Sequence, residues 1–348
     1  MKILITGGAG FIGSHAAEYY ASNGHEVEVI DNLSRAALLN KDVDLSLNNW
    51  DYLRENYPKI KLTKGDVRNS GDLKAACKGK DLVLHIAGQV AVTMSIAAPR
   101  IDFETNVVGT FNVLEAARQN DAMVVFTSTN KVYGENVNKI PVTQKEKRYE
   151  FADLAYTKGI PEEFSIDMTG HSPYGSSKLS ADVYVQDYAH TYGMKTGVFR
   201  MSCIYGERQY GVEDQGWVAW FIIAALTGRP LTIYGDGKQV RDVLYVSDLI
   251  RVFDDFVGSN LKNGVFNIGG GPQNTLSLLE LLDLLNDECK MKIDLKYTDW
   301  READQKVYIS DIDKAKKVLG WSPKVTPSNG IKSLIKWFSG NMNKIMCG

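Results

Sequence analysis

Residues 172–178 read SPYGSSK, which places Tyr174 and Lys178 four positions apart behind a proline. Ser172 and Pro173 are typical of the first residues of a helix, so the pair is expected on one helical face, a turn apart. A cation beside a phenol favours the phenolate, so Tyr174 could act as a general base. The same residues would also suit an ordinary helix start, and the other motifs decide between the two interpretations.

A hydroxyl that could complete such a site lies in TSTNKVYG, residues 127–134. This stretch follows the apolar run AMVVF and so ends a predicted strand, and strand carboxyl ends face the ligand crevice in parallel sheets. Thr129 could there hold the oxygen of an alcohol while Tyr174 removes its proton. Free tyrosine titrates near ~10, so Lys178 and a positive nicotinamide would have to lower that value.

A dinucleotide site is predicted at the amino-terminal end. TGGAGFIG places Gly7, Gly10 and Gly13 three apart between a strand and a helix, where backbone N–H groups can approach a pyrophosphate. Asp31 ends the second predicted strand, and its carboxylate would accept hydrogen bonds from a ribose and repel a 2'-phosphate. NAD is therefore favoured over NADP, although the nearby Arg35 could soften that preference.

Two further strand ends belong to the same crevice. Asp66 in GDVR is placed to meet the adenine, and HIAGQ at residues 85–89 ends the fourth predicted strand. The His85 side chain is expected to pack in the core rather than to act as an acid or base. No spacing of His, Cys, Asp or Glu indicates a metal site.

The elements that position these residues alternate short apolar strands with amphipathic helices, which predicts an α/β fold with a doubly wound parallel (Rossmann) sheet. GVFNIGGG, residues 264–271, is expected to return to this sheet. We expect a cofactor domain of residues 1–200, with a return segment near 241–270, and a smaller substrate lobe of residues 201–240 and 271–345. Ser277 and Glu280 are spaced as a capping box. The polar stretch 135–171 is far longer than ordinary loops, which indicates function or disorder.

Composition narrows the class of partner. The net charge is −2 and the pI near 6.2, so neither nucleic acid nor an anionic membrane is expected as a partner. The four cysteines are scattered, which favours a reducing cytoplasm, and the longest apolar run, residues 217–226, is too short to span a bilayer. A small molecule is the expected partner.

The order of these motifs resembles the extended short-chain dehydrogenase/reductases that act on nucleotide sugars, over nearly the whole chain. The resemblance implies that Tyr174 is the base, Lys178 its cofactor-holding partner and Thr129 the third catalytic hydroxyl, with Ser128 as an adjacent alternative. It implies a cofactor site formed by Gly7, Gly10, Phe11, Ile12, Gly13, Asp31, Asn32, Ser34, Arg35, Asp66, Val67, Ala87, Gly88, Gln89, Asn106, Thr127, Tyr174 and Lys178.

The resemblance also implies that Arg241 and Arg301 bind the substrate diphosphate. The full set of implied substrate-binding residues is Ser128, Thr129, Asn130, Lys131, Arg208, Gln209, Gln215, Gly216, Trp217, Tyr234, Arg241 and Arg301. The family further implies homodimers or homotetramers formed through helices near residues 101–118 and 176–192.

Asn130 and Lys131 stand where dehydratases of this family carry an Asp-Glu pair, which disfavours dehydration. TSTNKVYG, the insert before SPYG, DQGWVAWF and READQKVY resemble the CDP-tyvelose (CDP-paratose) 2-epimerases. The hydrogen at carbon 2 of a glycosyl nucleotide is not acidic, so such a reaction needs oxidation to a ketone and reduction on the other face, with NAD regenerated. A UDP-sugar 4-epimerase and a non-catalytic dinucleotide-binding protein are the alternatives.

Overall fold

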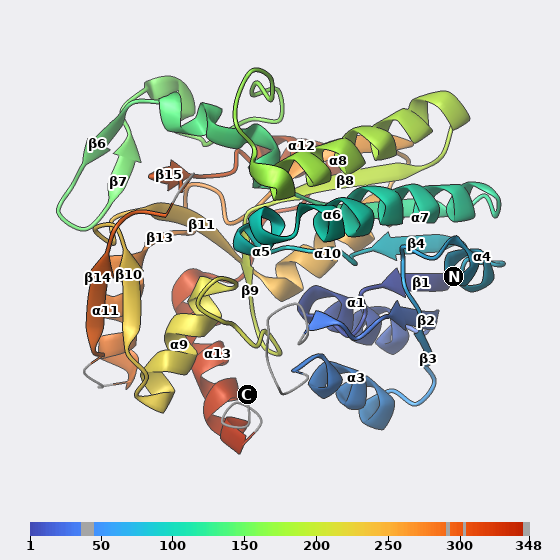
Figure 1. Cartoon of the computed structure of the whole chain (residues 1–348), viewed down its shortest axis with the longest axis horizontal. Helices are drawn as coiled ribbons and strands as arrows, with labels where there is room; N and C mark the ends of the chain where they lie inside the picture. The colour runs from blue at the N-terminus through green and yellow to red at the C-terminus, as the bar shows by residue number, and fades with distance from the viewer. Residues whose placement is uncertain (36–44, 290–292, 302–303, 344–348) are drawn as a thin grey trace.

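A computed structural model describes residues 1–35, 45–289, 293–301 and 304–343 (Figure 1). Its centre is a seven-stranded sheet in the order β12-β8-β5-β4-β1-β2-β3, and every neighbouring pair is parallel. The strands are β1 (Lys2–Thr6), β2 (Glu26–Asp31), β3 (Lys61–Lys64), β4 (Leu82–His85), β5 (Met123–Thr129), β8 (Thr196–Met201) and β12 (Asn263–Ile268). The predicted α/β fold with a doubly wound parallel sheet is confirmed, and the predicted return strand is β12.

Helices cover both faces of this sheet. On one face α1 (Phe11–Ser22), α3 (Leu45–Asn56), α10 (Val246–Gly258) and α12 (Asp313–Leu319) bury side chains such as Tyr20 and Phe253. On the other face lie α4 (Ser70–Ala76), α7 (Gly109–Arg118) and α8 (Ser172–Tyr192), with Leu73, Val113 and Val185 in the core. The short helices α5 (Val92–Ala97) and α6 (Pro99–Phe103) and the π-helix η1 (Glu104–Val108) precede α7.

The second lobe, at the left of Figure 1, combines two small sheets with three helices. In one sheet β11 (Val240–Tyr245) pairs with β9 (Cys203–Tyr205), β13 (Thr275–Ser277) and β15 (Val307–Tyr308), and in the other β10 (Leu231–Tyr234) pairs with β14 (Leu295–Thr298). Its helices are α9 (Trp217–Thr227), α11 (Leu278–Cys289) and α13 (Pro327–Gly340). The predicted capping box is present: Ser277 N donates to Glu280 Oε2 at 2.8 Å, and Glu280 N donates to Ser277 Oγ at 3.1 Å.

The long insert is folded and joins the two lobes. It contains the end of the 3-10 helix η2 (Asn130–Lys139), the hairpin β6 (Val142–Gln144) and β7 (Tyr149–Phe151), and η3 (Leu154–Tyr156). Tyr149 Oη donates to Asp236 at 2.7 Å, and Ile160 N donates to the Ile309 carbonyl at 2.7 Å. Asn267 Nδ2 on β12 donates to the Ile160 carbonyl at 2.8 Å, so the insert also contacts the large sheet.

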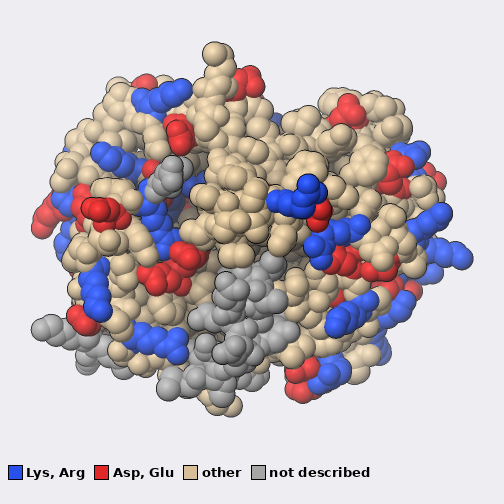
Figure 2. Space-filling view, in the orientation of Figure 1, with Lys and Arg blue, Asp and Glu red and all other residues tan. Residues whose placement is uncertain are grey.

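Acidic and basic side chains are interspersed on the face shown in Figure 2. Among the described helices, none is both long enough and apolar enough to cross a membrane.

Candidate functional site

The glycine-rich turn between β1 and α1 has the geometry that a pyrophosphate requires. Gly7 has φ +70°, and a Cβ there would lie 2.7 Å from the Ala87 backbone. A Cβ on Gly13 would overlap the Gly7 carbonyl oxygen. Only glycine fits these two positions, so the turn lies tight against the Ala87 backbone at the amino-terminal end of α1, formed by Phe11 and Ile12, where a phosphate group would be expected to bind.

Asp31 lies beside this turn, as predicted from its position at the end of β2. Its carboxylate accepts hydrogen bonds from Ala9 N at 2.9 Å and Leu33 N at 2.8 Å. Ser34 N donates to Asn32 Oδ1 at 3.0 Å in the turn that follows. The predicted ribose-binding acid is thus held at the rim of the predicted phosphate site by backbone N–H groups.

Arg35 has a hydrogen-bond partner in a distant segment of the chain. Its guanidinium donates to the Tyr210 carbonyl at 2.7 Å, and burial lowers its pKa. A guanidinium used in this way is not placed to meet a 2'-phosphate, which agrees with NAD rather than NADP.

The ends of β3, β4 and β5 carry the other residues that are predicted to bind the cofactor. Asp66 accepts from Asn32 Nδ2 at 2.9 Å, and a hydrogen bond from Arg68 lowers its pKa to about 2, against the effect of burial. Val67 beside it is buried. At the end of β4, Gln89 N donates to Asn106 Oδ1 at 2.9 Å. Thr127 Oγ1 on β5 donates to the His85 carbonyl at 3.2 Å.

Asn106 lies in the π-helix η1, an insertion in a helix that is common at functional sites. Its side chain also donates to Ser177 Oγ at 3.0 Å, which ties η1 to α8. A Cβ on Gly88 would lie 3.0 Å from Asn106 Oδ1 and 3.8 Å from Lys178 Nζ. The segment after β4 and the predicted catalytic helix α8 therefore meet at Gly88.

Thr129, Tyr174 and Lys178 come together at this edge. Burial raises the pKa of Tyr174 to about 12; a hydrogen bond with Thr129 lowers it and the Asp102 carboxylate raises it, so in the protein alone Lys178 does not produce the expected lowering. Burial lowers the pKa of Lys178 to about 7, while Asp182 and Asp102 raise it. The lysine ammonium lies 4.2 Å from the centre of the Phe126 ring, and the described residues offer its Nζ no hydrogen bond. Its donors remain available to a ligand.

The start of α8 follows the sequence prediction, except that Ser172 is itself the first residue of the helix. The helix begins at Ser172, whose φ is +59°, and Ser172 Oγ accepts from Gly175 N at 3.3 Å, the contact of a capping residue. Tyr174 N donates to Ser95 Oγ at 3.1 Å, so α5 also fixes this turn.

Two polar residues near Thr129 are committed elsewhere. Ser128 Oγ donates to Asp182 at 2.6 Å and is buried, so Thr129 rather than Ser128 is the hydroxyl that meets Tyr174. His85 is buried between Thr6 Oγ1 at 2.8 Å and Thr110 Oγ1 at 2.9 Å. Burial lowers the pKa of His85 to about 3, which agrees with the expected packing role.

A cationic cluster lies next to Thr129 and joins the two lobes. Burial and the charge of Arg241 lower the pKa of Lys131, whereas Asp304 raises it. Arg241 pairs with Asp304 at 2.6 Å, and Asn130 accepts from Thr129 Oγ1 at 3.3 Å. Lys131 and Arg241 thus lie near one described carboxylate, Asp304, and such an arrangement of two basic side chains suits an anionic group.

Arg301 forms a second cationic position. Its guanidinium pairs with Asp214 at 2.8 Å and stacks 3.9 Å over the Tyr234 ring, and Tyr234 Oη donates to Glu213 at 3.0 Å. Gln215 N donates to the Val212 carbonyl at 2.9 Å in this loop, and Gly216, with φ +76°, ends it at α9. Arg301 is thus held by the loop that contains the predicted residues 215 and 216.

Three other predicted substrate residues have different partners. Arg208 pairs with Glu18 at 2.6 Å and donates to Ser14 Oγ at 3.2 Å, so its side chain lies against α1 rather than beside Arg241 and Arg301. Gln209 Nε2 donates to the Ile204 carbonyl at 3.1 Å, and Trp217 packs edge-on against Phe221. Among the described residues Arg208 and Gln209 show no contact with the Lys131 cluster, whereas Trp217 contacts Cys203, whose thiol faces Lys131 and Arg241.

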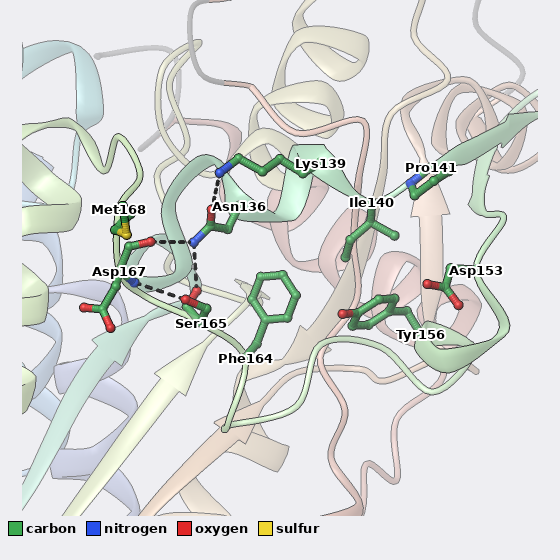
Figure 3. Close-up of a pocket in the computed structure, with 10 residues that line it drawn as sticks. All are labelled: Asn136, Lys139, Ile140, Pro141, Asp153, Tyr156, Phe164, Ser165, Asp167 and Met168. Carbon is green, nitrogen blue, oxygen red and sulfur yellow. Dashed lines mark hydrogen bonds between the residues drawn. The ribbon is translucent and has the colours of Figure 1, made fainter.

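A pocket of about 440 Å³ lies apart from all of these residues, within the insert (Figure 3). Asn136, Lys139, Tyr156, Phe164 and Asp167 are among the side chains that line it. It contains none of the predicted site residues. In the described part of the chain, no group of three or more His, Cys, Asp or Glu side chains is arranged to hold a metal ion.

Sequence reasoning missed Asp304, Asp102 and Ser95. Asp304 lies in READQ, and only the arginine of that motif was predicted. Asp102 and Ser95 carry no spacing signal, because their partners lie on elements that are distant in sequence. Only the folded chain shows that they surround Lys131, Lys178 and the start of α8.

Comparison with known proteins identifies the family. The profile of the NAD dependent epimerase/dehydratase family matches residues 3–269. A CDP-paratose 2-epimerase of Salmonella typhi is 42% identical, covering 97% of this chain and 99% of its own. A dTDP-glucose 4,6-dehydratase of Escherichia coli is 32% identical, covering 99% of this chain and 94% of its own.

Solved structures agree. UDP-glucose 4-epimerase of Thermotoga maritima with UDP-glucose superposes with a TM-score of 0.81 at 31% identity, over 98% of this chain and all of its own. UDP-glucuronic acid 4-epimerase of Bacillus cereus, in complex with UDP-glucuronic acid and NAD, gives 0.81 at 26% identity over 98% of this chain and all of its own. The predictions of NAD and of a nucleotide-sugar epimerase are confirmed, and the chain belongs to the NAD dependent epimerase/dehydratase family.

Proposed function

We propose that the chain epimerises CDP-paratose to CDP-tyvelose at carbon 2. The observation that carries the proposal is the contact between Thr129 and Tyr174 beside Lys178, next to a cluster in which Lys131 and Arg241 share one carboxylate. The relative that is 42% identical over nearly the whole of both chains is a CDP-paratose 2-epimerase, which favours this substrate among nucleotide sugars.

Tyr174 is proposed to take the proton from the sugar hydroxyl and later return it. Thr129 holds the same oxygen in line, because its hydroxyl already meets Tyr174. NAD held at this site would supply the redox chemistry, as acceptor and donor of the hydride of the sugar carbon. Lys178 favours the phenolate of Tyr174 by its charge and has donors free for a ribose. Gly7, Gly13 and Asp31 form the turn and rim that would hold the dinucleotide.

Dehydration is disfavoured by the two residues after Thr129. Elimination of water needs a carboxylic acid and a carboxylate base at the sugar, and here Asn130 and Lys131 occupy these positions. Lys131 is instead proposed to bind substrate. Together with Arg241, and with Arg301 from the neighbouring loop, it would neutralise the diphosphate.

A UDP-sugar 4-epimerase is the second candidate, because solved relatives that superpose over the whole chain carry that activity. The test is turnover of CDP-paratose and of UDP-galactose by the purified chain with NAD. Conversion of CDP-paratose alone supports the proposal. Conversion of UDP-galactose with no conversion of CDP-paratose replaces it with the second candidate.

We also propose that the chain forms a homodimer through α7 and α8. Phe111 and Tyr184 are 43% and 44% exposed and contact each other edge-on at 6.2 Å. Phe103, Val183 and Tyr192 are also exposed on these helices and on α6. An exposed apolar face of this kind is suited to a second copy, whose identical helices would cover it. Action in the cytoplasm and the division into the two predicted domains are part of the proposal.

A further inference from the structure

Asp102 is a buried carboxylate for which the proposed chemistry has no use so far. It lies on α6, is 1% exposed, and its Oδ1 accepts from Gln89 Nε2 at 2.9 Å and Asn106 Nδ2 at 3.2 Å. Its Oδ2 has no hydrogen-bond partner among the described residues. Burial raises the pKa of Asp102, while hydrogen bonds from Ser177 and Gln89 and the charge of Lys178 lower it. A buried acid held by two amides and left without a counter-ion is unfavourable unless another group offsets it.

The neighbouring charges show which group does so. The charged or titratable groups that face Lys178 are Asp182 on its own helix, Asp102 on α6 and His85 on β4, and Asp102 also faces Tyr174. Asp182 is already paired with Arg200 through contacts of 3.0 and 3.2 Å, and it also accepts from Ser128. His85 is neutral because burial lowers its pKa to about 3. Asp102 is therefore the carboxylate near Lys178 that forms no ion pair with another described cation, so its charge acts on Lys178.

We infer that Asp102 is a positioning residue, which acts through Lys178: its carboxylate, held by Gln89 and Asn106, keeps Lys178 an ammonium beside Tyr174. The same network fixes the geometry, since Asn106 also donates to Ser177 Oγ and Ser177 Oγ donates to the Tyr174 carbonyl at 3.0 Å. The inference rests on the proposed roles of Tyr174 and Lys178. Both groups lose protons more readily without Asp102, because its charge raises both pKa values.

The test uses the NAD-bound enzyme and the pH dependence of kcat/KM with CDP-paratose. Asp102→Asn keeps the shape and removes the charge, and Asp102→Ser is a second neutral variant that is smaller than the native residue. Asp102→Glu keeps the charge. Glu104→Gln is the matched control. Glu104 lies two positions after Asp102 and its side chain is partly exposed, so the variant removes one negative charge outside the site. We expect both limbs of the profile to move to lower pH by roughly one unit in either neutral variant, the order expected for losing one nearby interior charge.

Asp102→Glu and Glu104→Gln are expected to leave both limbs in place. Lower kcat at unchanged limbs in the neutral variants, or an equal displacement in Asp102→Glu, overturns the inference. A second measurement does not depend on the substrate: ultraviolet absorbance of the Tyr174 tyrosinate against pH, taken as the difference from Tyr174→Phe. A shifted titration in Asp102→Asn without turnover of CDP-paratose by the parent supports the inference and refutes the proposed substrate. An unshifted titration refutes the inference whatever the substrate.

Discussion

The Arg241 guanidinium pairs with the Asp304 carboxylate at 2.6 Å, and this pair faces Lys131 from the second lobe. Arg241 lies on β11, whereas Lys131 follows β5 of the large sheet. One carboxylate between two cations leaves a site in which a diphosphate would be the missing counter-charge.

Replacing Arg241 with alanine should therefore weaken nucleotide-sugar binding more than catalysis. Arg241→Ala is expected to raise KM roughly 10- to 100-fold with kcat little changed, because a contact to the diphosphate is equally present in the ground and transition states. Steady-state kinetics with CDP-paratose measure this. Arg251→Ala is the control, since Arg251 pairs with Asp248 at 2.6 Å outside the site. A fall in kcat at constant KM would refute the role of Arg241.

Tyr174→Phe should keep the fold and the bound NAD but lose turnover. The ring fills the same space, while the proton acceptor is gone, so a loss of at least ~100-fold is expected for a general acid-base group. Single-turnover kinetics and the absorbance of released NAD test the two parts separately. Turnover near the parental value would remove Tyr174 from the mechanism.

Lys178 should make the ligand-free protein less stable at low pH. Its pKa falls from its ordinary value to about 7 on folding, because burial disfavours the ammonium. The cost is fully present below the folded pKa, where both states are protonated, and it disappears as the pH rises to the unfolded pKa near ~10.4. Lys178→Met is thus expected to be more stable than the parent at pH ~6 by a few kcal/mol, and about equally stable above pH ~10.

Denaturant unfolding of the ligand-free protein at several pH values measures this difference. Lys78→Met, at an exposed lysine, is the control and should show no such trend. A constant difference between Lys178→Met and the parent at all pH values would show that Lys178 folds without this cost.

Phe111→Glu should separate the proposed dimer. A carboxylate in the centre of the exposed apolar face of α7 and α8 would be buried without a partner in the assembly. Sedimentation velocity is expected to give a dimer for the parent and a monomer for the variant. Lys74→Glu, exposed on α4, is the control. A parent that is monomeric at all concentrations, or a variant that stays dimeric, contradicts the proposed interface.

The parts of the fold set by local sequence were predictable. Short apolar runs predicted the strands, and three glycines predicted the tight turn that lies against the Ala87 backbone. Ser277 and Glu280 predicted the start of α11. The meeting of Thr129 with Tyr174 followed from the rule that strand carboxyl ends share one edge of a parallel sheet.

Contacts between distant segments were not predictable in this way. Arg241 contacts Asp304, 63 positions away in sequence, and Arg208 contacts Ser14, 194 positions away. The two arginines have the same side-chain chemistry, so the residue type alone does not distinguish them. Which of them joins the diphosphate cluster depends on how the second lobe packs on the large sheet. The insert shows the same limit, because its length suggested function or disorder and its hairpin pairs with residues more than 80 positions away.

The fate of one hydrogen tests the central claim, oxidation and reduction at carbon 2, most directly. CDP-paratose labelled with deuterium at carbon 2 is incubated with the enzyme in ordinary water until both epimers are present, and the products are examined by mass spectrometry and NMR. Hydrogen moved as hydride does not mix with solvent protons, so the account predicts that the label stays at carbon 2 of the product. Loss of deuterium from carbon 2 of the product would show that this hydrogen leaves as a proton, and it would contradict direct return of hydrogen at carbon 2.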